Sequence, residues 1–170
     1  MSDALIDHFR MFADYNRLAN ETLYATCAQL GDDERKKNRP AFFRSIHGTL
    51  NHIMVGDRIW LSRFEGGEVA STNLDAILYE DFEALVSARQ VEDARIADFV
   101  VNLEANWFAG DFVYVNNSGV RCNDPKPMIL AHFFNHQTHH RGQIHDMLSQ
   151  TDVPPPPLDL HRILRPDPTD

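Results

Sequence analysis

Four long stretches of this sequence repeat apolar side chains at the three- and four-residue spacing of an amphipathic helix. Capping residues, glycines and prolines stand at or near their ends. The expected helices lie between Ser2 and Gly31, between Pro40 and Gly66, from about Asp81 to Trp107, and from Pro125 to about Gln150. Because each such helix must bury its apolar face against another element, the pattern predicts an antiparallel-type four-helix bundle.

The stretch between the third and fourth expected helices has a different pattern. Residues 112–115 and 120–122 are β-prone, and they flank an Asn-Asn-Ser-Gly quartet that favours a tight turn. Asp124 is then expected to cap the last helix, with Pro125 at its first position. The predicted fold is therefore all-α, a four-helix bundle with a short β-hairpin before the last helix.

Length and composition limit the class of protein. A chain of 170 residues with 43% hydrophobic side chains suits a single domain over residues 1–170. The net charge of −9 disfavours nucleic acid as a partner, since proteins that bind it normally carry a clustered basic face. We find no secretory leader and no apolar run of membrane-spanning length, and Cys27 and Cys122 have no motif spacing. We therefore expect a soluble, cytoplasmic protein with no membrane partner.

Two histidines in the last expected helix, His136 and His140, are four residues apart and so share a helix face. At about 100° per residue they fall in an apolar stripe roughly 80° wide. The stripe consists of Ile129, Phe133, His136, His140, Ile144 and Met147. An imidazole in an apolar interior must be hydrogen-bonded, deprotonated or coordinated, which favours a shared metal ion over two separately satisfied core histidines. His132, His139 and His145 lie off the stripe and are expected at the rim or surface.

A catalytic zinc site typically takes three protein ligands, so a third is needed from a facing helix. The second expected helix offers His47 and His52, which are five residues apart and cannot both face the same point. Periodicity alone does not choose between them. Small residues on the face of His52, among them Thr49 and Gly56, would leave room for a metal and slightly favour that residue.

Two segments together carry a resemblance to a known family. Residues 49–60 contain a His-x4-Asp-x2-Trp pattern, and residues 135–143 contain His-x3-His-Arg-Gly-Gln. With residues 14–20 and the hairpin, these segments resemble the DinB (DinB/YfiT-like) metalloenzymes over nearly the whole chain. The resemblance implies an up-down-down-up bundle that often dimerises, so we expect a homodimer. It also implies a divalent metal held by three histidines, which map by position onto His52, His136 and His140.

The family resemblance does not imply a single chemistry. Some members are thiol-dependent S-transferases or isomerases that use low-molecular-weight thiols, and many have no assigned activity. Three neutral imidazoles leave a metal its full charge, so the metal can lower the pKa of a bound water or hold a thiol as thiolate. We expect a metal-dependent enzyme of thiol S-transferase or hydrolase type, acting on a small cytosolic molecule. Zinc is the first expectation for the metal and nickel the second.

Alternatives remain open for the site and for three polar residues near it. A metal-binding protein without catalysis, with a structural or stress-sensing role, would carry the same ligands. Asn16 interrupts an apolar stripe and is expected to make an interhelical hydrogen bond, and Asp57 is interpreted as a structural partner of an arginine. Gln143 could orient a ligand, or it could make an ordinary helix–helix hydrogen bond.

Overall fold

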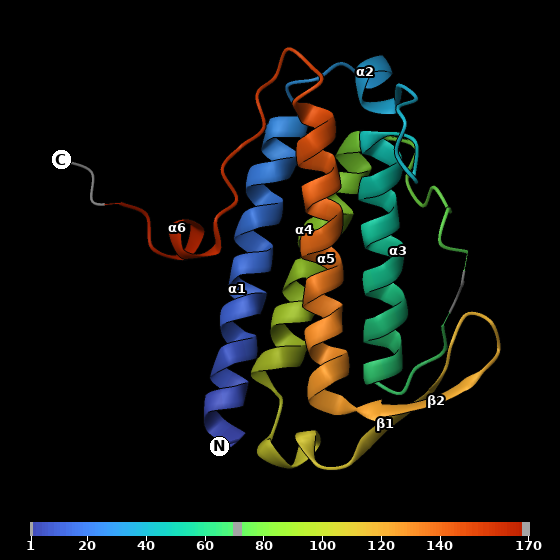
Figure 1. Cartoon of the computed structure of the whole chain (residues 1–170), viewed down its shortest axis with the longest axis vertical. Coiled ribbons are helices and arrows are strands. Elements are labelled where there is room, and N and C mark those ends of the chain that lie inside the picture. The colour runs from blue at the N-terminus through green and yellow to red at the C-terminus, as the bar shows by residue number, and fades with distance from the viewer. Residues whose placement is uncertain (1, 70–72, 168–170) are drawn as a thin grey trace.

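Four long helices make up most of the computed structural model, which describes residues 2–69 and 73–167 (Figure 1). They are α1 (Ser2–Cys27), α3 (Ile46–Phe64), α4 (Phe82–Val101) and α5 (Lys126–Leu148). The shorter elements are α2 (Asp32–Lys36), the 3₁₀ turn η1 (Ala105–Phe108), strands β1 (Asp111–Val115) and β2 (Arg121–Pro125), and α6 (Leu160–Leu164). The predicted order of long helices and the hairpin before the last of them are confirmed. No helix in these ranges is long and apolar enough to cross a lipid bilayer.

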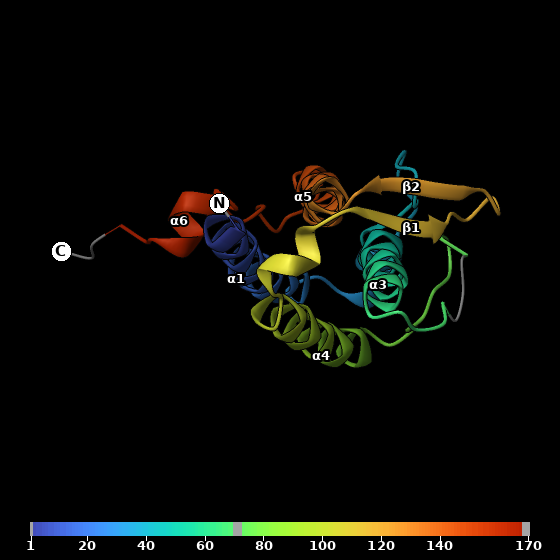
Figure 2. The ribbon, with the colours of Figure 1, turned by 90° about the horizontal axis from the view of Figure 1, so that it is seen from below.

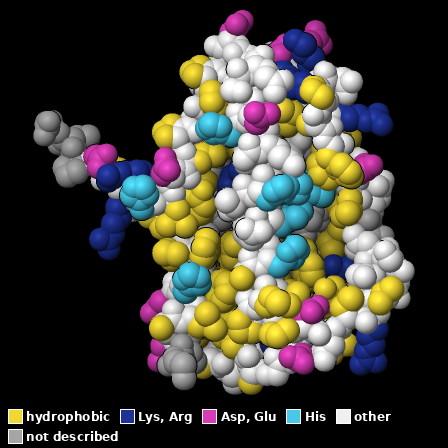
Figure 3. All heavy atoms as spheres, viewed as in Figure 1, with side chains coloured by type: hydrophobic (Ala, Val, Ile, Leu, Met, Phe, Trp, Pro, Cys, Tyr) yellow, Lys and Arg dark blue, Asp and Glu magenta, His cyan; other side chains and the backbone are white. Residues whose placement is uncertain are grey.

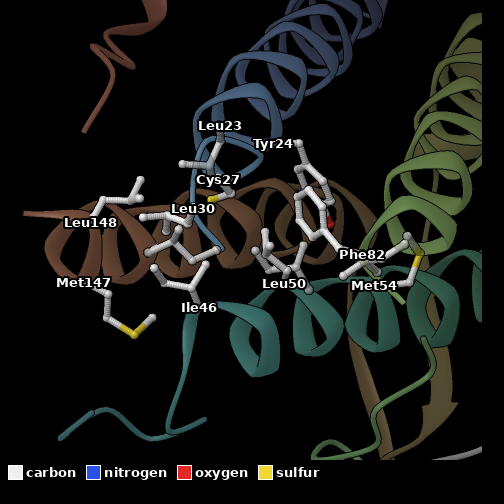
Figure 4. Packing of buried hydrophobic residues seen from close by; sticks show 13 residues of the cluster. Leu23, Tyr24, Cys27, Leu30, Ile46, Leu50, Met54, Phe82, Met147 and Leu148 are labelled. Carbon is white, nitrogen blue, oxygen red and sulfur yellow. The ribbon is translucent and has the colours of Figure 1, made fainter. Parts of the chain in front are cut away.

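The long helices form a bundle in which α1 contacts α4 and α5, and α3 contacts the same two helices (Figure 2). Two clusters of buried hydrophobic residues show the direction in which each long helix runs. One cluster includes Leu23, Tyr24, Ile46, Leu50, Phe82 and Met147, and joins the last turns of α1 and α5 to the first turns of α3 and α4 (Figure 4). The other joins the opposite ends and includes Phe9, Leu61, Phe64, Val100, Ile129 and Phe133. The chain therefore runs up, down, down and up through the bundle, as predicted.

Helix α3 begins later than the pattern predicts. Residues 41–44, which we expected to be helical, form an irregular loop, and the helix starts at Ile46. Ser45 provides the physical reason, because its backbone is extended and its hydroxyl accepts a hydrogen bond from the Gly48 N–H at 2.9 Å. Phe43 is thereby left in the loop.

Helix α4 ends earlier than expected. It stops at Val101, whereas the pattern predicted a helix to about Trp107. The side chain of Asn102 donates a hydrogen bond to the backbone carbonyl of Asp98 at 2.8 Å, which competes with continuation of the helix. The chain then turns into η1 and crosses the lower end of the bundle toward the hairpin.

The hairpin forms as predicted, but it includes residues expected to start the last helix. Strand β2 continues to Pro125, and α5 begins at Lys126. Asp124 lies within the strand, and its carboxylate accepts a hydrogen bond from the Tyr114 hydroxyl at 3.1 Å. Asp124 therefore stabilises the hairpin and makes no side-chain cap for α5, which corrects the predicted cap.

A buried polar network lies near the middle of the four long helices. It consists of Asn16 and Asn20 of α1, Asp57 of α3, Arg89 and Asp93 of α4, and Gln137 and Arg141 of α5. Arg89 forms ion pairs with Asp57 at 2.5 Å and with Asp93 at 3.0 Å. Both asparagines donate to Asp93 and accept hydrogen bonds from Arg141. The interhelical hydrogen bond expected of Asn16 and the arginine partner expected of Asp57 are confirmed.

Candidate metal centre

Three histidine side chains from two neighbouring helices meet near the surface of the bundle. His52 lies on α3, and His136 and His140 lie about one turn apart on α5. The Nε2 atom of His52 is 3.1 Å from the Nε2 atom of His136 and 3.1 Å from that of His140. In the part of the chain that the structure describes, these residues form the one group of His, Cys, Asp or Glu side chains close enough to share a metal ion. Figure 3 shows histidine side chains gathered near the middle of this face.

The ring of His52 is held by two loops. Its Nδ1 atom is 3.0 Å from the backbone carbonyl of Leu74. A carbonyl can only accept a hydrogen bond, so Nδ1 carries the ring proton and Nε2 presents a lone pair. Phe43 stacks on the ring with centroids 3.6 Å apart and an interplanar angle of 16°. The next residue, Arg44, has a φ of 64°, an uncommon conformation for a residue with a Cβ, so backbone strain lies beside the site.

The ring of His140 is oriented from within its own helix. Its Nδ1 atom is 2.8 Å from the Oε1 atom of Gln143, one turn further along α5. The amide nitrogen of Gln143 is in turn 3.2 Å from the Nε2 atom of His139. Of the two roles that the sequence left open for Gln143, the geometry therefore supports orientation of His140. His140, like His52, presents its Nε2 lone pair toward the other imidazoles.

The ring of His136 packs directly against the backbone of α3 at Gly56. A Cβ atom at position 56 would lie 2.7 Å from the Cε1 atom of His136, closer than packed carbon atoms approach. The absence of a side chain at Gly56 therefore creates the space for the ring. The sequence pattern anticipated room beside His52, and the structure shows that this room is filled by His136.

Burial favours the neutral form of all three imidazoles. Loss of water contact is the largest cause, and it lowers the pKa of His52, that of His140 to about 4 and that of His136 to about 3. The neighbouring imidazoles lower the pKa of His136 and His140 further. At neutral pH the site therefore presents unprotonated nitrogens, the form in which histidine binds metals.

The Nε2 atoms of His52 and His140 lack a hydrogen between them. The Nδ1 atoms of His52 and His140 hold the ring protons, so two Nε2 lone pairs face each other across 3.1 Å. That arrangement is repulsive unless a cation lies between the lone pairs. A tetrahedral zinc ion with Zn–N bonds of about 2.05 Å would separate its nitrogen ligands by about 3.3 Å, close to the distances here. The donor set and its spacing fit a small divalent transition metal.

The remaining histidines of the two helices do not join this group. His47 points elsewhere, and its Nε2 atom is 2.8 Å from the backbone carbonyl of Tyr79. His132 and His139 are exposed and His145 is half-buried, in keeping with their predicted place at the rim or surface. Of the two candidates on α3, His52 and not His47 therefore lies beside His136 and His140.

Two cavities flank the loop that carries Phe43. One, of about 650 Å³, is lined by Lys36, Asn38, Phe42, Phe43, Arg44, Ser45, Gly48, Asp75 and Ile77. The other, of about 500 Å³, reaches Gln143 and His139 on the far side of Phe42. Phe42 lies between the two cavities and is 82% exposed. The lining of each cavity includes a residue that contacts one of the three histidines, Phe43 in the first and Gln143 in the second.

Comparison with known proteins finds one family and two relatives that match most of this chain. The model of the DinB family matches residues 1–170. The protein named DinB of Bacillus subtilis (strain 168) is 26% identical over 160 residues, which cover 89% of this chain and 90% of that protein. The uncharacterized protein YizA of the same organism is 26% identical over 137 residues, covering 78% of this chain and 81% of YizA.

Proposed function

The chain belongs to the DinB family, and from that premise we propose that it holds one divalent transition metal through His52, His136 and His140. The observation that carries this proposal is the convergence of three Nε2 atoms, of which those of His52 and His140 face each other without a hydrogen between them. Zinc is the proposed ion, and nickel is the alternative because three imidazoles bind several late transition metals well.

The residues around the three imidazoles would prepare them as ligands. The Leu74 carbonyl and the Gln143 amide keep the protons of His52 and His140 on Nδ1, so that both Nε2 atoms stay available. Phe43 covers one face of His52 and excludes water from it. A divalent ion in this position would supply a Lewis acid that stabilises a bound hydroxide or thiolate near neutral pH.

We further propose that the site is catalytic, of thiol S-transferase or hydrolase type, and acts on a small molecule. Support comes from the ligand count, because within residues 2–69 and 73–167 no fourth His, Cys, Asp or Glu joins the group. Cys27 is buried in the upper core, where burial raises its pKa to about 12, and Cys122 lies in β2. A three-ligand site leaves a position for a thiol or a water, as catalytic zinc sites do.

The experiment that tests this function compares metal-free protein with zinc- and nickel-loaded protein. Conjugation of glutathione, bacillithiol or mycothiol to monochlorobimane is measured, together with hydrolysis of a panel of activated esters and amides. Metal-dependent turnover that is lost in His52→Ala and kept in His47→Ala supports the enzyme. Stoichiometric metal binding without turnover on either panel favours the non-catalytic alternative, a metal-binding protein with a structural or sensing role.

The proposed assembly and domain organisation rest on the family resemblance and on chain length. We propose a single domain over residues 1–170 that forms a homodimer. Sedimentation equilibrium at micromolar concentration should give twice the 19.5 kDa mass of the chain. A species of monomer mass would remove the dimer from the proposal.

A further inference from the structure

The buried polar network and the three histidines are adjacent along α5. Gln137 directly follows His136, and Arg141 directly follows His140. Successive residues of a helix point about 100° apart, so α5 presents its histidines on one side and its network residues on the next. Any rotation of α5 that moved one set would therefore move the other.

Gln137 connects the two helices that carry the histidines. Its amide nitrogen donates a hydrogen bond to the Oδ1 atom of Asp57 on α3 at 2.8 Å, and its side chain is fully buried. Directly beside this contact, Gly56 of α3 lies against the ring of His136. Two consecutive residues of α3 thus meet two consecutive residues of α5, one pair at the site and one pair in the network.

Arg141 connects α5 to its other neighbouring helix, α1. Its guanidinium donates hydrogen bonds to the side-chain oxygens of Asn16 and Asn20 on α1, and it lies over the ring of Tyr15. This side chain is 2% exposed. α5 is thereby fixed from two sides, by Gln137 toward α3 and by Arg141 toward α1.

We propose that Gln137 and Arg141 are positioning residues for the metal site, which hold α5 in the rotation that brings His136 and His140 to His52. This role rests on the proposed function, since it concerns the same three imidazoles. The proposal assigns these two buried polar residues a role in the metal site in addition to any role in stability. An apolar pair of similar volume could fill the same space without fixing the helix rotation.

The test compares Gln137→Met with Val100→Ala. Methionine keeps the length and approximate volume of glutamine but cannot donate to Asp57. Val100 is fully buried in the lower core cluster, so its truncation destabilises the fold without touching either polar group. Both variants are titrated with Co²⁺ in the metal-free protein, followed by the visible spectrum of the bound ion, and their melting temperatures are measured in parallel.

We expect Gln137→Met to bind Co²⁺ about tenfold or more weakly, with an altered spectrum, as changes next to metal ligands typically do. Val100→Ala should melt earlier yet keep the wild-type affinity and spectrum. Arg141→Lys, which keeps the charge but loses the forked contacts to α1, provides the same test if Gln137→Met does not fold. Wild-type affinity and spectrum in the folded network variant would overturn the positioning role and leave the proposed function intact. Absence of Co²⁺ binding by the wild type would overturn both.

Discussion

The bundle contains two neighbouring polar clusters, the buried polar network and the three histidines, and they differ in which polar groups face each other. In the buried polar network, groups of opposite character face each other, with Arg89 between two carboxylates and Arg141 between two amide oxygens. In the histidine cluster, the Nε2 atoms of His52 and His140 meet with no donor between them. The first cluster is held together by ion pairs and hydrogen bonds within the chain, whereas in the second a cation would relieve the repulsion between the lone pairs of His52 and His140. A cluster in which like groups are held close together is therefore a better guide to a candidate site than one in which opposite groups face each other.

The largest expected effect is a difference in the free energy of unfolding between a variant of the network and a variant of the histidine cluster. Asp57→Ala removes the carboxylate that faces Arg89 and leaves a buried guanidinium with one partner fewer. We expect a loss of about 3–5 kcal/mol in the free energy of unfolding, measured by urea denaturation of the metal-free protein. His52→Ala, in the other cluster, should cost far less in the same measurement, because it relieves a repulsive contact. Equal losses in the two variants would contradict the contrast between the clusters.

Gly56→Ala tests the close approach of α3 and α5. The new methyl group would lie 2.7 Å from the Cε1 atom of His136, so the ring or the helix must move. Overpacking of this kind typically costs about 1–3 kcal/mol, and we expect a comparable loss together with weaker metal binding. Gly142→Ala is the matched control, since a Cβ there meets nothing within 4 Å. Urea denaturation and Co²⁺ titration of both variants provide the measurement, and indistinguishable results would argue against a tight contact at Gly56.

Gln143→Leu addresses the orientation of His140 alone. Without the amide oxygen the ring can turn or change tautomer, and we expect metal affinity to fall about tenfold, at the lower end of the range for such partners. Stability of the metal-free protein should change little, because Gln143 is only partly buried. Isothermal titration with Zn²⁺ measures the affinity. Unchanged affinity would show that Gln143 does not orient His140 for metal binding.

The last expected effect is the pH dependence of the stability of the metal-free protein. Above the ordinary histidine pKa of 6.5, the folded and unfolded chains both hold these imidazoles neutral. As the pH falls below that value, the unfolded chain takes up protons that the folded site excludes, down to a pKa of about 4 for His140 and about 3 for His136. The free energy of unfolding should therefore decline between pH 6.5 and 4, by at most about 1.4 kcal/mol per pH unit for each of these two groups. The decline should be shallower in His136→Leu, and equal slopes for the two proteins would oppose the assignment.

The sequence predicts the scaffold well because the information is local. Helical spacing places the four long helices, and turn-forming residues mark the hairpin, without knowledge of distant contacts. The errors lie at helix ends, where single side chains such as Ser45 and Asn102 decide the boundary through hydrogen bonds that periodicity does not record. His136 and His140 are predictable for the same reason as the helices, since both lie on one stripe of one helix.

What the sequence could not supply depends on contacts between segments. The Nδ1 atom of His52 contacts the backbone carbonyl of Leu74. Every residue has such a carbonyl, so the residue type at position 74 does not reveal this partner. Phe43 was expected inside a helix and instead covers the site from a loop. Gln137 and Arg141 lie off the apolar stripe, so periodicity would place them toward solvent, although both are buried against partners on α3 and α1. Only the packing of the bundle shows that α5 buries a second, polar face.

The most direct test of the account is the metal content of the protein reconstituted with Zn²⁺ and passed through a desalting column. Elemental analysis should find about one ion per chain in the wild type, in His47→Ala and in His132→Ala. It should find almost none in His52→Ala, His136→Ala or His140→Ala, because a three-ligand site loses most of its affinity with any one imidazole. Full occupancy in any of these last three variants, or its loss in His47→Ala, would contradict the site assigned here.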